Sequence, residues 1–473
     1  MKPRRPHLVP SIAVALALAG LAACAPLGPD YQRPALDLPA DYPEAAAGTT
    51  AGLRADWWNA FNDPILNELV AAARERNADI RIAAAQLEEA DAALREVDAG
   101  FYPQVDLAFA NSQSRVSALT ALPNPLPRIR LERRLAASTA FELDFWGRLR
   151  RGVEAARAQA LATRYAGDTV ALTLAGTVAQ TYFALRSLDS QITLTRATLA
   201  TREEALQVVS DRVSGGVAPE LEQRQAEVVR ADAAVQLDEL ARQRKVVEHQ
   251  LAQLTGRPGS NVTTGSLFAL PLPPPPPADL PSALLERRPD IRAAEQSLIA
   301  VNARIGVAKA ALFPIISLTG SYGGQSAAFG DLLLGGARIW SLGFGLALPL
   351  FDAGRGAARV EQAEARARQA VAGYQRSVET GFREVADALG NLEMGRRSED
   401  NLAARTIAAR RALEIARIRH AAGYSGYLEV LDSQRTANEA ELAAVRNRQA
   451  MLAYSVDLMK ALGGGWSATS ATK

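Results

Sequence analysis

The stretch "NADIRIAAAQLEEADAALREVDAGFYPQVDLA" (Asn77–Ala108) recurs later in the chain as "RPDIRAAEQSLIAVNARIGVAKAALFPIISLT" (Arg288–Thr319). The two stretches align without a gap at a spacing of 211 residues. Among the identical residues that meet are Asp79, Ile80, Arg81, Leu87, Pro103 and Leu107, against Asp290, Ile291, Arg292, Leu298, Pro314 and Leu318. A chain that repeats a segment of this length is built from equivalent structural units, so this repetition decides the fold.

The repetition continues toward the C-terminus at a spacing of 207 residues. "GRLRRGVEAARAQA" from Gly147 aligns with "GRGAARVEQAEARA" from Gly354. The turn "RVSGGVAPELEQ" from Arg212 aligns with "RHAAGYSGYLEV" from Arg419. The order of segments is the same in both copies, which indicates an internal duplication.

Two structural repeats therefore organise the chain, and a run of five prolines separates them. We predict a signal peptide at 1–23, a lipid-anchored N-terminal segment at 24–62, a first repeat at 63–270, a Pro-rich linker at 271–281, a second repeat at 282–462 and a flexible C-terminal tail at 463–473. The proline run favours an extended and stiff connector.

The sequence pattern of each repeat predicts, in order, a helix, two extended segments, a long helix and a last helix. Asp63 and Pro64 are typical of an N-cap and a first helical position. The predicted helices are 63–99, 147–214 and 219–256 in the first repeat, and 282–312, 354–422 and 426–462 in the second. A helix of about 66 residues is roughly 100 Å long, which indicates coiled packing or a structure that crosses a distance.

The extended segments between the helices alternate with a period of two. One face is apolar and the other polar or small, as in Leu135, Ala137, Thr139, Phe141, Leu143 and Phe145, and again in Trp340, Leu342, Phe344, Leu346, Leu348 and Leu350. Segments 103–114 and 314–325 show a weaker form of the pattern. About ten alternating residues are typical of a transmembrane β-strand, although a half-buried soluble sheet has the same pattern.

Four strands cannot close a barrel, and hydrocarbon does not tolerate unpaired strand edges. Other copies of the chain must therefore complete a membrane sheet. Two copies would give eight strands with a filled interior, whereas three give twelve strands around a water-filled lumen. The Gly, Ala and Ser residues of the inward face favour three copies.

The N-terminus has the three parts of a secretory signal peptide. Lys2, Arg4 and Arg5 form a basic start, and the apolar run 12–21 is shorter than the ~20 residues that span a bilayer. Leu21-Ala22-Ala23-Cys24 resembles the lipobox of bacterial lipoproteins, in which the cysteine receives a lipid and becomes the mature N-terminus. Cys24 is the only cysteine, so it has no intramolecular disulfide partner. An ordinary signal peptide with a chance cysteine is the alternative.

Composition and motifs argue against an enzyme, a metalloprotein or a nucleic-acid binder. The chain has 473 residues and a net charge of +2, and the signal peptide carries three of the basic residues. His249 and His420 have no second ligand at metal-binding spacing, so we expect no metal site. "GYSGY" misses the G-x-S-x-G motif because Tyr427 stands at the last glycine. We expect no catalytic residue and no cofactor other than the lipid on Cys24.

Several stretches resemble the TolC-like outer-membrane efflux family, in particular its lipidated members that serve resistance-nodulation-division pumps. They are "DWWNAFNDPILNELV", "ELDFWGRLR", "RPDIRAAEQSLIAVNARIGVAKAALFPIISLTGSYG", "WSLGFGLALPLFDAGRG" and "AGYSGYLEVLDSQR". The resemblance covers nearly the whole mature chain. It implies a mixed α and β membrane protein, in which three copies form a 12-stranded transmembrane β-barrel continuous with a periplasmic 12-helix α-barrel.

The same resemblance implies the function and the partners. The trimer would be a passive duct in the cell outer membrane that exports drugs and toxic compounds. Its partners would be a periplasmic adaptor protein and an inner-membrane transporter, with no nucleic acid involved. Two alternatives stay open, namely an outer-membrane channel of a type I protein secretion system and a structural coiled-coil lipoprotein.

The resemblance also assigns two sets of site residues near the helical turns. Glu429 and Asp432 match the carboxylates of the periplasmic gate. They lie three residues apart on a helix, so three-fold symmetry would produce two stacked rings of negative charge. The resemblance also implies that residues of the turns contact the adaptor, namely Gly215, Gly216, Val217, Gly423 and Tyr424. The plain alternatives are solvated helix carboxylates and helix C-caps.

Overall fold

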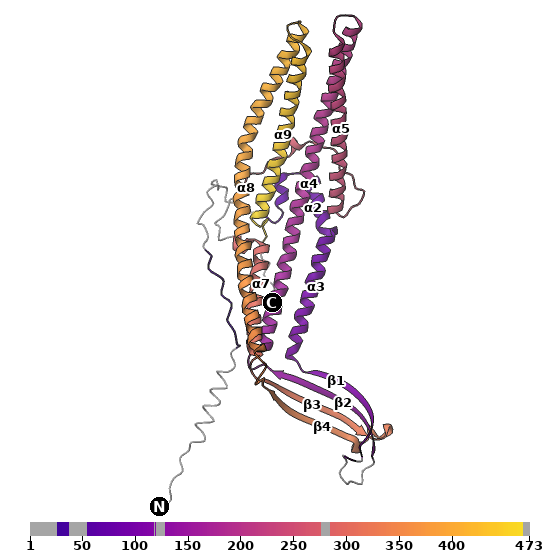
Figure 1. Ribbon diagram of the computed structural model, residues 1–473, viewed down its shortest axis with the longest axis vertical. Helices are drawn as coiled ribbons and strands as arrows, with labels where there is room; N and C mark the ends of the chain where they lie inside the picture. The colour runs from indigo at the N-terminus through magenta and orange to yellow at the C-terminus, as the bar shows by residue number, and fades with distance from the viewer. Residues whose placement is uncertain (1–25, 37–53, 118, 120–127, 276–283, 467–473) are drawn as a thin grey trace, which may run out of the picture. The chain divides into compact units, whose positions relative to one another are not determined.

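The computed structural model describes residues 26–36, 54–117, 119, 128–275 and 284–466 (Figure 1). The chain divides into two compact units. The sheet unit contains 26–35, 87–163 and 294–374, and the helical unit contains the described residues of 36–86, 164–293 and 375–466. The fold is mixed α and β.

Helices make up most of the described chain, and four strands form its sheet. The helices are α2 (Pro64–Arg76), α3 (Ala78–Asp98), α4 (Arg148–Ser214), α5 (Glu220–Leu254), α6 (Leu284–Arg287), α7 (Pro289–Ala310), α8 (Arg355–Ala421) and α9 (Tyr427–Ala461). The strands are β1 (Gln104–Arg115), β2 (Ile129–Leu143), β3 (Ile315–Ser326) and β4 (Arg338–Ala347). A short 3₁₀ helix, η1 (Trp57–Phe61), precedes α2.

The two repeats carry equivalent elements, and three pairs of these elements match in length. Helices α4 and α8 each have 67 residues, and α5 and α9 each have 35. Strands β1 and β3 each have 12 residues. Three glycines with positive φ in the first copy have counterparts with positive φ in the second, namely Gly147, Gly216 and Gly256 with Gly354, Gly423 and Gly463.

The sheet unit contains one antiparallel sheet in the order β1-β2-β3-β4. The hairpins β1–β2 and β3–β4 come from the two copies, and β2 pairs with β3 between them. Strands β1 and β4 are therefore the edges of the sheet, and each has one side without a partner strand (Figure 1).

The helical unit has a hydrophobic core that joins elements from both copies. Phe61, Val70, Tyr182 and Phe183 are fully buried in this core. Asp63 begins α2 as predicted, because its carboxylate accepts hydrogen bonds from the backbone N–H of Ile65 (2.8 Å) and Leu66 (3.2 Å). The second carboxylate oxygen of Asp63 accepts the Tyr182 hydroxyl at 2.5 Å, so one side chain both caps the helix and ties it to α4.

The helix predicted from Asp63 to Ala99 is interrupted at Asn77, which corrects the sequence-based prediction. Asn77 has extended backbone angles, and its side-chain oxygen accepts the N–H of Asp79 at 2.7 Å. This bond begins a new helix, α3. The second copy is interrupted at the equivalent position, Arg288, between α6 and α7.

These two interrupting residues perform the same task with different chemistry. The Asn77 amide donates to the carbonyl of Leu254, the last residue of α5, at 2.9 Å. The Arg288 guanidinium donates to the carbonyl of Ala461, the last residue of α9, at 3.1 Å. The last carbonyls of a helix have no partner within the helix, so each contact satisfies one and fixes the end of the helix.

The start of the predicted C-terminal tail is packed, which corrects a second expectation. Gly463 and Gly464 are buried, and the Trp466 indole N–H donates to the Asp168 carboxylate at 3.1 Å. Residues 467–473 lie outside the described residues. Among the residues that the structure describes, no helix combines the length and the apolar character that a membrane span requires.

Candidate functional site

The sheet exposes an apolar face along all four strands. The cross-strand register places Leu107, Ala137, Tyr322 and Trp340 side by side on this face. Trp340 is 76% exposed and Leu342 is 78% exposed, and Leu107 is 73% exposed at the opposite edge. Large side chains of this kind are rarely exposed together on a water-soluble surface, so the face requires an apolar environment.

The other face of the sheet carries small and polar side chains. Gly343 and Gly345 on β4 face Thr319 and Ser317 on β3. An added Cβ at either glycine would come within 3.0 Å of the hydroxyl oxygen opposite, so the small residues let these hydroxyls approach the backbone. The two faces thus have the composition expected for lipid on one side and water on the other.

The segment after the predicted lipidation site is fixed to the sheet unit. Cys24 itself lies outside the described residues. Arg151 of α4, whose side chain is 7% exposed, forms an ion pair with Asp30 at 2.7 Å. Arg33 forms an ion pair with the buried carboxylate of Glu295 at 2.6 Å, and the Tyr31 hydroxyl donates to the same carboxylate at 3.1 Å. Burial, followed by the charge of Glu295, raises the pKa of Tyr31, so this hydroxyl stays protonated as a donor.

The two helical turns of the predicted adaptor contact have the same backbone hydrogen bonds. In the first turn, Val217 N–H donates to Arg212 O at 2.9 Å and Gly216 N–H donates to Val213 O at 3.0 Å. In the second turn, the N–H groups of Tyr424 and Gly423 donate to the carbonyls of Arg419 and His420 at 2.9 and 3.0 Å. This is the Schellman motif, which needs positive φ at one residue, here Gly216 and Gly423. Both turns are therefore C-caps.

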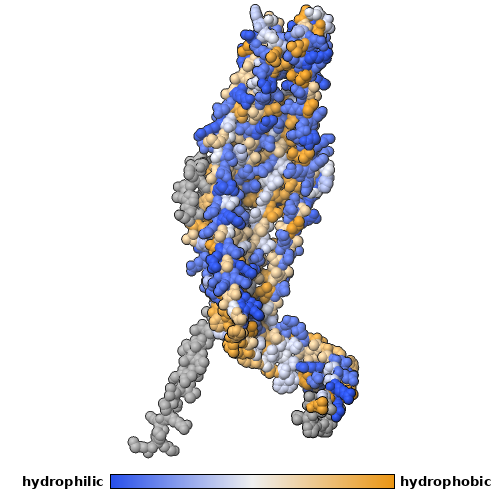
Figure 2. Space-filling view, viewed as in Figure 1, coloured by the Kyte–Doolittle hydropathy of each residue, from blue (hydrophilic) through white to orange (hydrophobic). Residues whose placement is uncertain are grey.

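Each turn presents a pair of exposed apolar side chains, and only one member of each pair was predicted. Val217 is 70% exposed and Tyr424 is 80% exposed. Leu221 and Leu428 were not predicted, and they are 65% and 67% exposed at equivalent positions in the two repeats. The spacing of 207 residues between two leucines was the signal that would have found them. We call these four residues the tip patch, and Figure 2 shows hydrophobic residues at this end of the helices.

The predicted gate carboxylates lie on the exposed side of α9. Tyr427 and Val430 on the same helix are buried, and Glu429 and Asp432 lie on the opposite side. Glu429 forms an ion pair with Arg419 at 3.2 Å, and Asp432 with Arg435 at 2.8 Å. All four side chains are at least 45% exposed, so each pair contributes only about 0.2–1 kcal/mol. The sequence-based expectation of negative rings did not include these arginine partners.

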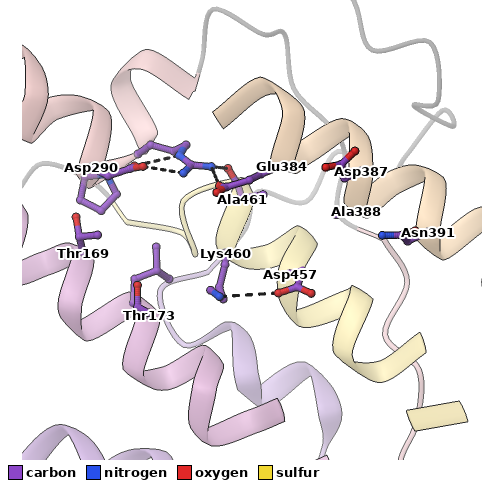
Figure 3. Close-up of a pocket in the computed structure, with 13 residues that line it drawn as sticks. Thr169, Thr173, Asp290, Glu384, Asp387, Ala388, Asn391, Asp457, Lys460 and Ala461 are labelled. Carbon is purple, nitrogen blue, oxygen red and sulfur yellow. Dashed lines mark hydrogen bonds and ion pairs between the residues drawn. The ribbon is translucent and has the colours of Figure 1, made fainter. Parts of the chain in front are cut away.

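The charged cavity shown in Figure 3 has a volume of about 470 Å³ and lies in the helical unit. The Arg288 guanidinium, which is almost fully buried, occupies one wall and contacts Asp290 and Glu384, each at 2.7 Å. Burial lowers the pKa of Arg288, but hydrogen bonds and charges from both carboxylates outweigh it and leave the pKa raised. On the other side of the cavity, Lys460 pairs with Asp457 at 3.8 Å.

The charges around this cavity hold helices together. Arg288 links the start of α7 to α8 and to the end of α9, and Gly176 leaves space on α4 for the stem of Lys460. In the described part of the chain, no group of three or more His, Cys, Asp or Glu side chains is placed to hold a metal ion. The contacts of Arg288 with α7, α8 and α9 make the cavity a structural junction.

The sequence profile of the "Outer membrane efflux protein" family matches residues 69–257 and 280–464. These two ranges correspond closely to the two repeats and leave out the run of five prolines at 273–277 between them.

Curated relatives match over almost the whole chain. Outer membrane protein OprJ of Pseudomonas aeruginosa is 34% identical over 456 residues, which cover 94% of each chain. Toluene efflux pump outer membrane protein TtgI of Pseudomonas putida is 35% identical and covers 95% of this chain and 97% of its own. Cation efflux system protein CusC of Escherichia coli is 33% identical, with coverage of 96% and 97%.

Solved structures of outer membrane channels share the fold. The open state of the Neisseria gonorrhoeae MtrE outer membrane channel has a TM-score of 0.84 and 29% identity, with coverage of 95% of this chain and 100% of that chain. The Campylobacter jejuni CmeC outer membrane channel has a TM-score of 0.87 and 25% identity, with coverage of 94% and 96%.

We predict that Arg288→Ala lowers the free energy of unfolding by about 2–3 kcal/mol, because it leaves buried polar groups without their partner. Arg383→Ala is the matched control, since Arg383 and its partner Asp387 on α8 are 65% and 58% exposed. The control should change stability by less than about 0.5 kcal/mol. Thermal unfolding followed by the circular dichroism of the helices measures both, and equal shifts would contradict the role of Arg288.

We also predict that Gly216→Ala and Gly423→Ala each destabilise their turn by about 1 kcal/mol or more, because a Cβ disfavours positive φ. Gly215→Ala is the matched control, since Gly215 lies in the same turn and is not among the positive-φ glycines. Hydrogen exchange at the turn amides reports the local effect. Faster exchange in the control than in Gly216→Ala would show that the assignment of the C-cap is wrong.

Proposed function

The chain belongs to the outer membrane efflux protein family, and on that premise we propose that three copies form a passive, lipid-anchored export duct that is gated at its periplasmic end. The observation that carries this proposal is the four-stranded sheet with an exposed apolar face and two unpaired edges. As a family member the chain is an outer-membrane efflux channel.

Closure of the sheet requires other copies. A single copy leaves the backbone groups on the outer sides of β1 and β4 without partner strands, and such groups cost several kcal/mol each in hydrocarbon. Pairing β4 of one copy with β1 of the next satisfies both edges at once. Three copies give twelve strands, enough for a water-filled lumen, and the small and polar face would line it.

The N-terminal segment supports a lipid anchor on Cys24. Its contacts with Arg151 and Glu295 fix residues 27–33 on the sheet unit. Cys24 lies only three residues before Leu27, so a lipid attached there would be held close to this unit. A single acyl chain binds membranes only weakly, and here the barrel would supply the permanent insertion.

The gate is assigned to Glu429 and Asp432 together with Arg419 and Arg435. Three-fold symmetry would place twelve charged groups around the axis, in pairs whose charges nearly cancel. Because all of these side chains are exposed, they remain available to exchange partners with a neighbouring copy. A periplasmic mouth held closed by ion pairs between neighbouring copies would open when these ion pairs separate, and no helix would need to unfold.

The tip patch is assigned to the periplasmic adaptor. Val217, Leu221, Tyr424 and Leu428 are exposed apolar residues at the ends of the two helical hairpins. Exposed Leu and Tyr side chains on rigid helical turns are suitable anchors for a partner protein, because little conformational entropy is lost when they are covered.

The cargo is small molecules supplied by an inner-membrane transporter. Relatives carry the names toluene efflux pump and cation efflux system, so the family transports chemically different solutes. A passive duct selects by size and charge, and the chemical selection belongs to the transporter.

We predict that Glu429→Ala/Asp432→Ala raises the single-channel conductance in planar bilayers by about two-fold or more, because it removes the ion pairs with Arg419 and Arg435 that are proposed to hold the mouth closed. The matched control is Glu220→Ala/Glu227→Ala, which removes two exposed carboxylates that pair with Arg224 on α5. The control should conduct like the wild type. Conductance that is unchanged in the gate variant would remove the gate, and no conductance from a folded wild-type trimer would favour a structural lipoprotein.

We predict that Leu428→Glu abolishes co-purification with the periplasmic adaptor and leaves the conductance unchanged, because it places a charge in an apolar contact. Leu428→Met keeps the apolar side chain and should retain the adaptor. Full co-purification with Leu428→Glu would show that the adaptor binds elsewhere.

A further inference from the structure

The charged residues on the apolar face of the sheet are all arginines, and all lie near one end. On this face the strands carry Arg115, Arg133 and Arg338. The acidic residues of the strands, Asp106, Glu132 and Glu142, alternate to the opposite face. The opposite face also carries Arg130 and Arg134, so it has charges of both signs. The strand residues of the apolar face carry positive charge alone, which favours an anionic partner on that side.

Arg133 and Arg338 lie close to the row of the sheet that contains the aromatic residues Tyr322 and Trp340. Tyr322 pairs with Trp340 across β3 and β4, and these side chains are 61% and 76% exposed. Arg338 lies two residues from Trp340 on the same face, and Arg133 lies one row further toward the hairpin loops. Aromatic side chains are typical of the boundary between hydrocarbon and headgroups, so the arginines lie at the level of the headgroups.

The hairpin ends of the sheet are the ends away from the helices. Helices α3 and α7 lead into β1 and β3, and α4 and α8 follow β2 and β4. If the helices are periplasmic, as the proposed function has it, the hairpin ends face the outer leaflet. Hydrophilic residues gather at this end of the sheet in Figure 2.

Arg133 and Arg338 are close enough to bind one headgroup. Arg133 lies on β2 and Arg338 on β4, two strand spacings apart, and they are offset by two residues along the strands. This corresponds to about 12 Å between their Cα atoms. Extended arginine side chains span that distance around a small anion. The Arg133 guanidinium also donates to the carbonyl of Ala327, which directs it along the sheet surface. No carboxylate of the described residues forms an ion pair with either arginine.

We propose that Arg133 and Arg338, next to Tyr322 and Trp340, form a site for the phosphate groups of an outer-leaflet glycolipid. Guanidinium binds phosphate through two parallel hydrogen bonds, and the neighbouring aromatic rings pack against the sugar and the first acyl carbons. A phosphorylated diglucosamine lipid of the lipid A type fits this arrangement, because it has two phosphates on one rigid headgroup. The inference rests on the proposed membrane location of the sheet.

The experiment measures bound lipid by native mass spectrometry of the purified full-length trimer. Diphosphorylated lipid A is the probe, and the same lipid without phosphates is the comparison. Arg133→Gln/Arg338→Gln should reduce bound lipid A by about five-fold or more. The matched control is Arg130→Gln/Arg134→Gln, which removes two arginines from the same strand region on the opposite face and should leave binding unchanged.

Arg133→Lys/Arg338→Lys keeps the charge and should retain at least about half of the binding, which separates loss of the site from loss of the fold. The proposal is overturned if the Gln variant keeps its lipid, if the control loses as much, if the phosphate-free lipid binds equally well, or if inorganic phosphate displaces the lipid at millimolar concentration. Conductance of each variant is measured in parallel. A conducting trimer without lipid selectivity refutes this site alone, whereas a protein that does not conduct refutes the proposed function.

Discussion

Backbone hydrogen bonding in hydrocarbon is the constraint on which the account depends. A bilayer offers no water to the N–H and C=O groups of a strand edge, and the sheet has two such edges in each copy. A soluble sheet can cover an edge with a helix or a charged side chain. Here the edge strands β1 and β4 also expose large apolar side chains, which need lipid around them. Closure through neighbouring copies removes both difficulties at once. The lumen, the ring of helices and a gate on the symmetry axis all depend on that closure.

The duplication explains how one chain supplies two nearly equivalent sectors of a tube. Its two repeats keep the lengths of the two longest helices, α4 with α8 and α5 with α9, and the same Schellman turns, although few side chains are shared. The contact that fixes the end of each last helix shows how far the chemistry has diverged. Asn77 satisfies Leu254 through an amide, whereas Arg288 satisfies Ala461 and also binds Asp290 and Glu384. Backbone requirements have been kept, while the side chains that meet them have changed.

Much of this structure was predictable from the sequence, and the failures have physical causes. Helical periodicity, the Asp63 cap and the strand alternation predicted the order of the elements, because each is a local property. The interruption at Asn77 was missed because it is stabilised by a hydrogen bond to the carbonyl of Leu254, which is far away in the sequence. The ion pairs of Glu429 and Asp432 were also missed. Arg419 lies on another helix, so its pair with Glu429 is not a local property. Arg435 lies three residues after Asp432 on the same helix, so that pair was predictable from the spacing alone.

The most direct test of the closed trimeric sheet is cross-linking between its edges in outer membranes. Cysteines at Ala108 on β1 and Gly343 on β4, both on the small and polar face, are treated with a flexible bismaleimide. If β4 of each copy lies beside β1 of the next, the double variant should form covalent dimers and trimers but nothing larger, and neither single variant should form trimers. Products that stop at dimers, or a ladder that continues beyond trimers, would contradict the account.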